Sequence, residues 1–241
     1  LYMALIRHLM NNGNRHIPAH LQSVNHWVHK SGAPTRMAFD PHLLSPKIGD
    51  MKSGIVSPPV VIVELTRACN YHCPYCYAPS EFISKPLSLE DIRDRIVRPF
   101  MDYGATHFAL TGGEPVLCAT HTAKVARMIR EEAEGRGLNL FLGVLTNGKG
   151  FADRAKEFFD SGINHVQVSM GAFDTERDRA IRGVPYPVDG VAESKRAVEA
   201  CLKNGIYVET NTILVPDSEN RHGNICDIED ILEYGMTRGV N

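Results

Sequence analysis

From residue 59 onward the sequence alternates between short apolar runs and longer segments with helical periodicity. The apolar runs, several of them rich in β-branched residues, cover residues 60–65, 107–110, 138–146, 166–170 and 206–214. The segments with apolar residues at helical spacing cover residues 88–103, 119–134, 151–160, 189–203 and 226–237. This alternation predicts an α/β fold, a parallel sheet covered by helices with right-handed crossovers. Ligands and reacting groups in such folds lie at the carboxyl ends of the strands.

The first 58 residues have a different character. Their six Lys and Arg against two Asp and Glu give a net charge of +4, whereas residues 59–241 carry a net charge of −6. They also hold six of the eleven histidines and the single tryptophan, Trp27, which lies in a stretch with helical spacing of apolar residues. The sequence therefore predicts a helical and irregular N-terminal extension over 1–58 and a core domain over 59–241.

Composition excludes several classes of protein. Hydrophobic residues make up 43% and charged residues 22% of the 241 residues, as in ordinary globular proteins. No apolar run approaches the ~20 residues that cross a bilayer, and the first residues of this sequence do not show the basic-then-apolar pattern of a signal peptide. A formal net charge of −2 does not indicate a nucleic-acid surface. We therefore expect a cytoplasmic protein with neither a membrane nor a nucleic acid as partner.

Three of the six cysteines lie within eight residues, directly after the first predicted strand. Cys69, Cys73 and Cys76 have the spacing C-x3-C-x2-C, at the end of the sheet where reactions occur. Three thiolates on one short loop can hold three corners of an iron–sulfur cubane and leave the fourth iron open. They can also hold three positions of a zinc ion, with His72 or a distant cysteine as the fourth ligand. The cysteine spacing leaves both possibilities open.

A second motif follows the second predicted strand. Gly112, Gly113 and Glu114 form the centre of Thr-Gly-Gly-Glu-Pro. Paired glycines allow a backbone to approach a ligand closely, and the glutamate adds a fixed anionic acceptor. Alone, this motif could be a simple turn, but it lies one β-α unit after the cysteines.

Together the two motifs resemble the radical S-adenosylmethionine (radical SAM) enzymes. The matching features are C-x3-C-x-aromatic-C, with Tyr75 as the aromatic residue, and the Gly-Gly-Glu-Pro that follows the next strand. The resemblance covers residues 58–241. It implies a partial TIM-type (β/α)6 barrel, of which five β-α units are recognisable.

Later elements resemble the family with differences. Thr146-Asn147-Gly148 is similar to a family element after the third strand. Ser169 and Arg182-Gly183 lie in a segment similar to S-x-D-G followed by H-D-x-x-R-G. However, Gly171 stands where the family has Asp, and Asp178-Arg179 stands where it has His-Asp.

The resemblance implies two cofactors, a [4Fe–4S] cluster on Cys69, Cys73 and Cys76, and S-adenosylmethionine. It places the ammonium group on the glycine motif with Glu114 as its charge-assisted partner. It places Tyr75 beside the adenine, Ser169 on the ribose or carboxylate, and Arg182 on the carboxylate. An exposed loop arginine is the alternative reading of Arg182. The candidate cofactor-binding residues are Tyr75, Gly112, Gly113, Glu114, Asn147, Ser169, Arg182 and Asn211.

The implied activity is reductive cleavage of S-adenosylmethionine to a 5′-deoxyadenosyl radical that abstracts hydrogen from a small molecule or a peptide. The sequence is similar both to peptide maturases of the SPASM type and to molybdopterin-biosynthesis enzymes. A flavodoxin- or ferredoxin-like protein is the expected reductant. The alternative function is a non-catalytic zinc- or iron–sulfur-binding interaction protein.

The resemblance also indicates whether these 241 residues contain the whole half-barrel. A half-barrel of this family has six strands, and Gly-Val-Asn at residues 239–241 is how a further strand opens. Without a sixth strand, residues 206–214 would expose one edge and its unpaired backbone groups. We therefore expect these 241 residues to be part of a longer polypeptide, or to be completed by another chain.

Overall fold

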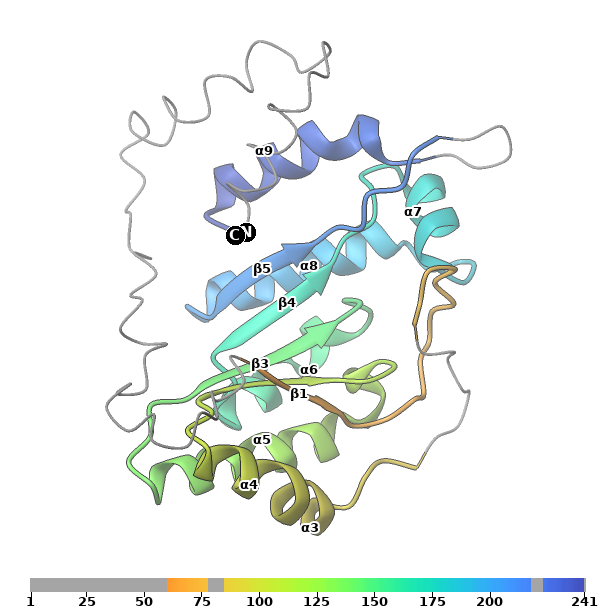
Figure 1. Cartoon of the computed structure of the whole chain (residues 1–241). Coiled ribbons are helices and arrows are strands. Elements are labelled where there is room, and N and C mark those ends of the chain that lie inside the picture. Colours follow the sequence, from red (N-terminus) through yellow and green to blue (C-terminus); the bar gives the residue numbers. More distant parts are fainter. Residues whose placement is uncertain (1–59, 78–84, 218–222, 241) are drawn as a thin grey trace, which may run out of the picture. The chain divides into compact units, whose positions relative to one another are not determined.

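The computed structural model describes residues 60–77, 85–217 and 223–240 (Figure 1). The predicted extension over 1–58 lies outside the described residues, so its helix and the domain boundary stay predictions. The strands are β1 (Val61–Glu64), β2 (His107–Thr111), β3 (Phe141–Thr146), β4 (His165–Ser169) and β5 (Tyr207–Asn211). The α-helices are α3 (Leu89–Ile92), α4 (Arg98–Asp102), α5 (Ala119–Glu134), α6 (Phe151–Asp160), α7 (Thr175–Arg182), α8 (Gly190–Lys203) and α9 (Ile228–Arg238). The other helical segments are the π-helix η4 (Arg93–Val97) and the 3-10 helices η5 (Pro115–Cys118) and η6 (Ile225–Asp227).

The five strands form one parallel sheet in the order β1-β2-β3-β4-β5, as predicted. Each strand pairs in parallel with the next one in the sequence, so each connection between neighbouring strands contains helical segments and returns the chain to the start of the next strand. Figure 1 shows α5, α6 and α8 behind the sheet. All five carboxyl ends therefore lie along the same end of the sheet, which brings together the loops that follow β1 to β4.

The core lies between the sheet and these helices. One register row crosses all five strands, and each of its side chains is buried against the helices. The row consists of Val63, Leu110, Val144, Val166 and Val208. The alternate side chains face the other side of the sheet, where Ile62 is 62% exposed. Successive side chains of each strand therefore point to opposite faces of the sheet, and one of these faces is covered by the helices.

The first predicted helix is confirmed with one difference. Ser88 caps it by accepting a hydrogen bond from the Asp91 amide at 3.0 Å. Its middle turn is the π-helix η4, and the chain then continues into α4. Gly104, with a φ of 90°, follows the helix end, as the sequence indicates.

Strand β1 is one residue shorter than predicted at each end, and β3 and β5 differ more from their predicted lengths. Residues 138–140 precede β3 because the Leu138 amide donates to the Ala133 carbonyl and so closes the end of α5. The predicted strand 206–214 ends at Asn211 because the next backbone groups bond elsewhere. The Asn224 side chain accepts a hydrogen bond from the Val215 amide and donates one to the Ile213 carbonyl.

The sequence missed helix α7. Asp174 caps it and Gly183, with a φ of 60°, ends it, which are ordinary helix boundaries. The helix is nevertheless so polar that Ala180 and Ile181 are its only apolar residues. It therefore has no apolar periodicity to detect. Within the described ranges, no helix is long and apolar enough to cross a membrane.

The buried register row across the five strands makes the fold sensitive to the loss of a side chain from that row. Leu110 is fully buried, whereas Leu117 in η5 is 50% exposed. We expect Leu110→Ala to lower the free energy of unfolding by roughly 2–5 kcal/mol, through lost burial and a residual cavity. The matched Leu117→Ala change should alter it by about 0.5 kcal/mol or less. Urea unfolding followed by circular dichroism measures both, and equal effects would contradict the assigned core.

Candidate active site

The loop that follows β1 carries the three cysteines and pairs with the loop that follows β2. The Gly113 amide donates to the Thr66 carbonyl at 2.6 Å, and the Glu114 amide donates to the Ala68 carbonyl at 2.8 Å. These bonds hold the start of the cysteine loop against the Gly-Gly-Glu-Pro segment. The two loops, one unit apart in the sequence, are therefore adjacent at the carboxyl end of the sheet.

The paired glycines are needed for this contact. A Cβ atom at Gly112 would lie 2.2 Å from the Thr66 carbonyl oxygen, and one at Gly113 would lie 2.1 Å from that of Ala68. Gly112 also has a φ of 142°, which side-chain-bearing residues rarely adopt. The sequence predicts that the glycines admit a ligand. The structure shows them admitting the backbone of the cysteine loop.

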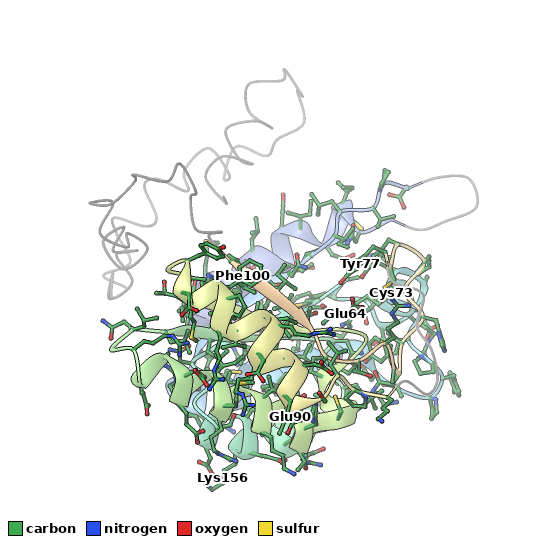
Figure 2. All side chains as sticks on the ribbon, turned by 60° about the horizontal axis from the view of Figure 1, so that its bottom comes forward. Glu64, Cys73, Tyr77, Glu90, Phe100 and Lys156 are labelled. Atoms are coloured by element: carbon green, nitrogen blue, oxygen red, sulfur yellow. The ribbon has the colours of Figure 1, made fainter. Side chains whose placement is uncertain are left out.

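The thiols differ in exposure. Cys69 and Cys73 are half-buried, and Cys76 is exposed. Burial raises the pKa of the Cys69 and Cys73 thiols above the ordinary value. The Cys73 thiol donates to the Arg182 carbonyl at 3.0 Å, and the Asn147 side-chain amide lies 3.9 Å from the Cys69 sulfur. Figure 2 shows Cys73 on the same side of the molecule as Glu64 and Tyr77, away from Lys156 of α6.

The three thiols do not converge on one point in the described part of the chain. Over the residues for which positions are described, no three Cys, His, Asp or Glu side chains gather around a point that one ion could occupy. In a cubane each thiolate binds a different iron, so its three ligands need not converge on one centre. The donor set, three thiols on one loop, therefore fits an iron–sulfur cluster better than a zinc ion.

Glu114 lies at the centre of the site and is fully buried. Its carboxylate accepts from the Val116 amide at 3.0 Å, the Thr146 hydroxyl at 2.8 Å and the Asn147 amide at 2.6 Å. Burial raises its pKa to about 7, and these three hydrogen bonds act in the opposite direction. The carboxylate caps η5 and ties the end of β2 to the end of β3.

Asn147 connects the end of β3 to the cysteine loop. Its side-chain amide donates to the Asn70 side-chain oxygen at 2.7 Å, and its own side-chain oxygen accepts from the Lys149 amide at 3.0 Å. The side chain is half-buried. Asn147 follows β3, close to Cys69, and its contacts within the protein are themselves sufficient to fix its position.

Arg182 is not an exposed loop residue. It is the last residue of α7, and it is 1% exposed. Its guanidinium forms two hydrogen bonds of 2.7 Å with the Asp178 carboxylate. The exposed-loop alternative is wrong because the guanidinium has a buried partner within the chain, which the sequence analysis did not assign.

The remaining predicted residues are placed at the same end of the sheet with differing surroundings. Ser169 ends β4, and its carbonyl accepts from Arg182 at 2.8 Å and from Ser194 at 2.8 Å. Tyr75 is 40% exposed, and burial raises the pKa of its hydroxyl above the ordinary value. Asn211 ends β5, is exposed, and accepts from the Met170 amide through its carbonyl at 3.0 Å.

Sequence reasoning missed Tyr71, Thr146 and Asp178. Tyr71 lies between two of the cysteines, is 1% exposed, and its buried hydroxyl has no hydrogen-bond partner among the described residues. Thr146 bonds the buried carboxylate described above. Asp178 was noted as a departure from a motif, and only its contact with Arg182 gives it a role. No sequence signal could supply these pairings, because each joins residues distant in the chain or on a helix that went unrecognised.

Comparison with known proteins agrees with this geometry. The Radical SAM superfamily profile matches residues 63–234, which is more than half of the chain. The chain belongs to the radical SAM superfamily. Members of this family bind a [4Fe–4S] cluster and S-adenosylmethionine, the two cofactors that the resemblance implies.

Curated relatives of this radical SAM chain include GTP 3′,8-cyclases. That of Rhizobium leguminosarum bv. trifolii is 28% identical over 182 residues, which is 74% of this chain and 49% of the relative. That of Brucella canis is also 28% identical over 182 residues, with the same coverage. The chain thus spans about half the length of the curated relatives it matches.

Solved structures show the same fold at low identity. Methylornithine synthase (PylB) has a TM-score of 0.56 and 16% identity, covering 75% of this chain and 50% of that one. The methyltransferase TsrM from Kitasatospora setae, with cobalamin and a [4Fe–4S] cluster bound, has a TM-score of 0.55 and 15% identity, covering 75% and 35%. The protein anSMEcpe with bound AdoMet has a TM-score of 0.51 and 21% identity, covering 63% and 42%.

The raised pKa of Glu114 predicts a pH-dependent stability. Between its ordinary value near 4.5 and its folded value of about 7, the folded protein binds more protons at this residue than the unfolded chain does. The free energy of unfolding should therefore fall as the pH rises through this range, by on the order of 3 kcal/mol, and stay constant above it. Glu114→Gln should remove this contribution.

Urea unfolding at several pH values between 4.5 and 8 measures the difference between the two proteins. Glu90→Gln, at an exposed glutamate, is the control and should leave the pH profile unchanged. Parallel profiles for wild type and Glu114→Gln would show that Glu114 is ionised throughout.

Proposed function

We propose that this chain holds a [4Fe–4S] cluster on Cys69, Cys73 and Cys76 and cleaves S-adenosylmethionine reductively. The observation that carries the proposal is the placement of three thiols on one loop, which backbone hydrogen bonds join to the glycine motif at the carboxyl end of the sheet. When bound, the cluster and S-adenosylmethionine supply a 5′-deoxyadenosyl radical that abstracts hydrogen from a substrate. The protein supplies binding and orientation.

Several side chains are available to contact S-adenosylmethionine. Tyr75 presents a partly exposed ring next to Cys76 and can lie beside an adenine. Asn147 and Ser169 are half-buried at the ends of β3 and β4, and Asn211 is exposed at the end of β5. We keep these four residues, with the backbone of Gly112 and Gly113, as the proposed contacts.

We assign Glu114 and Arg182 a different part in binding. The side chains of both are buried and hydrogen-bonded within the chain. A carboxylate that already accepts three hydrogen bonds has little capacity left for a ligand ammonium group. We propose that Glu114 acts mainly by holding the ends of β2 and β3, so that neighbouring backbone groups face the ligand.

The charged residues of the strands give an indication of the class of substrate. None of β1 to β5 contains a Lys or an Arg, whereas β1 ends with Glu64 and β5 contains Glu209. Glu209 accepts from the Gln167 side chain at 2.6 Å, and its hydrogen bond with His165 lowers its pKa. Strands that carry glutamate but no Lys or Arg do not favour a triphosphate such as the GTP in the names of the curated relatives. We propose an uncharged or cationic small molecule or a peptide as substrate.

The proposal includes an electron donor and a compartment. A small flavodoxin- or ferredoxin-like protein would supply the electron. The cytoplasm is the fitting location because reduced thiols persist there. A non-catalytic zinc- or iron–sulfur-binding interaction protein is the competing function, and the absence of a converging ligand set among the described residues does not favour its zinc form.

Anaerobic reconstitution with iron and sulfide tests the function. The protein should take up four irons per chain with matching sulfide, and should release 5′-deoxyadenosine and methionine when S-adenosylmethionine and dithionite are added. A protein purified with stoichiometric zinc and unable to incorporate iron would favour the competing function.

The three cysteines should be individually required. Cys69→Ala, Cys73→Ala or Cys76→Ala should lose most of the bound iron and all 5′-deoxyadenosine formation, because each would remove one of only three protein ligands. Cys226→Ala, at an exposed cysteine near the start of α9, is the matched control and should keep both. Iron analysis and chromatography of the nucleoside provide the readouts. Near-stoichiometric iron in the triple variant would show that these cysteines are not the ligands.

A further inference from the structure

The carboxyl end of the sheet contains a buried ion pair that the proposed cofactor contacts do not use. Asp178 is fully buried and Arg182 is 1% exposed, both on helix α7. Two hydrogen bonds of 2.7 Å join the guanidinium to the carboxylate. A buried pair of this kind is costly to desolvate and gains its energy only from good geometry and further hydrogen bonds. The partners of this pair therefore indicate what it holds in place.

On one side the pair holds the strand ends. Arg182 Nη1 donates to the Asn147 carbonyl at 3.1 Å and to the Ser169 carbonyl at 2.8 Å. Asp178 accepts from the Gly171 amide at 3.1 Å and from the Ala172 amide at 3.3 Å. The ends of β3 and β4 and the segment that follows β4 are thus joined to α7 through two side chains.

On the other side the end of α7 holds the cysteine loop. The His72 amide donates to the Gly183 carbonyl at 3.1 Å, and the Cys73 thiol donates to the Arg182 carbonyl. A Cβ atom at Gly183 would lie 2.1 Å from the His72 carbonyl oxygen, so this contact requires a glycine. The Arg182 guanidinium also lies 5.4 Å from the centre of the Tyr71 ring, a cation–π contact. The hydrogen bond from the Cys73 thiol requires a protonated Cys73. The His72–Gly183 hydrogen bond and the Arg182–Tyr71 contact do not depend on the protonation of a cysteine.

Two glycines make room for the Asp178 carboxylate. A Cβ atom at Gly171 would lie 2.7 Å from Asp178 Oδ1, and one at Gly190 would lie 2.3 Å from Oδ2. Position 171 is where the family pattern has Asp, and position 178 is where it has His. An aspartate side chain at 171 would enter the space that the Asp178 carboxylate now fills. Positions 171 and 178, the two differences from the family pattern, are seven residues apart in the sequence, but their side chains would share one space in the fold.

We propose that Asp178 and Arg182 are positioning residues that hold the cysteine loop against the ends of β3 and β4. In this chain the carboxylate that pairs with Arg182 comes from position 178 on α7, and an aspartate at position 171 could supply it equally well. The proposal rests on the proposed function, because its consequence is the placement of the cluster ligands relative to S-adenosylmethionine. It adds Asp178 and Gly171 to the site and gives Arg182 a partner within the chain.

The first experiment uses a change that keeps the charge. Arg182→Lys retains a cation for Asp178, but its three N–H groups cannot replace the four hydrogen bonds of the guanidinium. We expect amide hydrogen exchange in residues 69–77 of the cluster-free protein to become roughly tenfold faster, while exchange in α5 stays unchanged. Arg177→Lys is the control. Arg177 lies on the same helix and pairs with Asp227 at 2.5 Å, so its substitution should leave the cysteine loop unaffected.

The second experiment moves the carboxylate. Asp178→Ala should accelerate exchange in residues 69–77, or prevent folding by leaving Arg182 unpaired. Gly171→Asp combined with Asp178→Ala should fold and restore slow exchange, whereas Gly171→Asp alone should be destabilised by two carboxylates in one space. In reconstituted protein, the electron paramagnetic resonance spectrum of the reduced cluster should respond to S-adenosylmethionine in the combined variant as in wild type. That response should be weakened in Arg182→Lys.

Two results would overturn the proposal. One is a folded Arg182→Lys or Asp178→Ala protein with wild-type exchange in residues 69–77 and a wild-type spectrum. The other is a combined variant that fails to fold or fails to restore slow exchange. Failure of the proposed function is distinguishable, because wild-type protein would then bind no cluster, whereas the exchange measurements need no cluster.

Discussion

A charged group buried at the end of a parallel sheet must find its hydrogen-bond partners inside the protein, and this requirement shapes the end that carries the cysteines. Glu114 and Arg182 are the two central cases. The carboxylate gathers donors from η5 and from the end of β3, and the guanidinium gathers acceptors from β3, β4 and α7. Both groups bond the backbone of Asn147. Loops that follow three different strands are thereby fixed relative to one another before any cofactor is considered.

The second constraint is space. The backbones in this region approach so closely that a methyl group would collide at Gly112, Gly113 and Gly183, in each case with the cysteine loop. The glycines thus serve contacts within the chain, and their value for binding is indirect. A loop held at this many points can place three thiols without a disulfide, which suits a site whose ligands must remain reduced. A radical SAM site needs such a fixed frame, because the protein contributes binding and orientation while the cofactors contribute the radical chemistry.

Much of the fold could be predicted because it follows from local patterns. The strands read as short apolar runs because Leu110 and its neighbours in the central row lie between the sheet and the helices. Helices α5 and α6 have the predicted bounds because their apolar faces repeat with the helical period. Helix α7 escaped prediction for the opposite reason, since its buried side chains include Asp178 and Arg182, which no hydrophobic pattern reveals.

The sequence by itself determined the class of fold, the position of the cysteine loop at the carboxyl end of β1, and membership of the radical SAM superfamily. These depend on period, spacing and residue type, all of which are local. The partners of Glu114 and Arg182, and the space that Gly171 leaves for Asp178, were decided only by the tertiary structure. Each of these is a contact between segments that the fold brings together, and the energy of a buried charge depends on all of its neighbours at once. A one-dimensional pattern does not contain that sum.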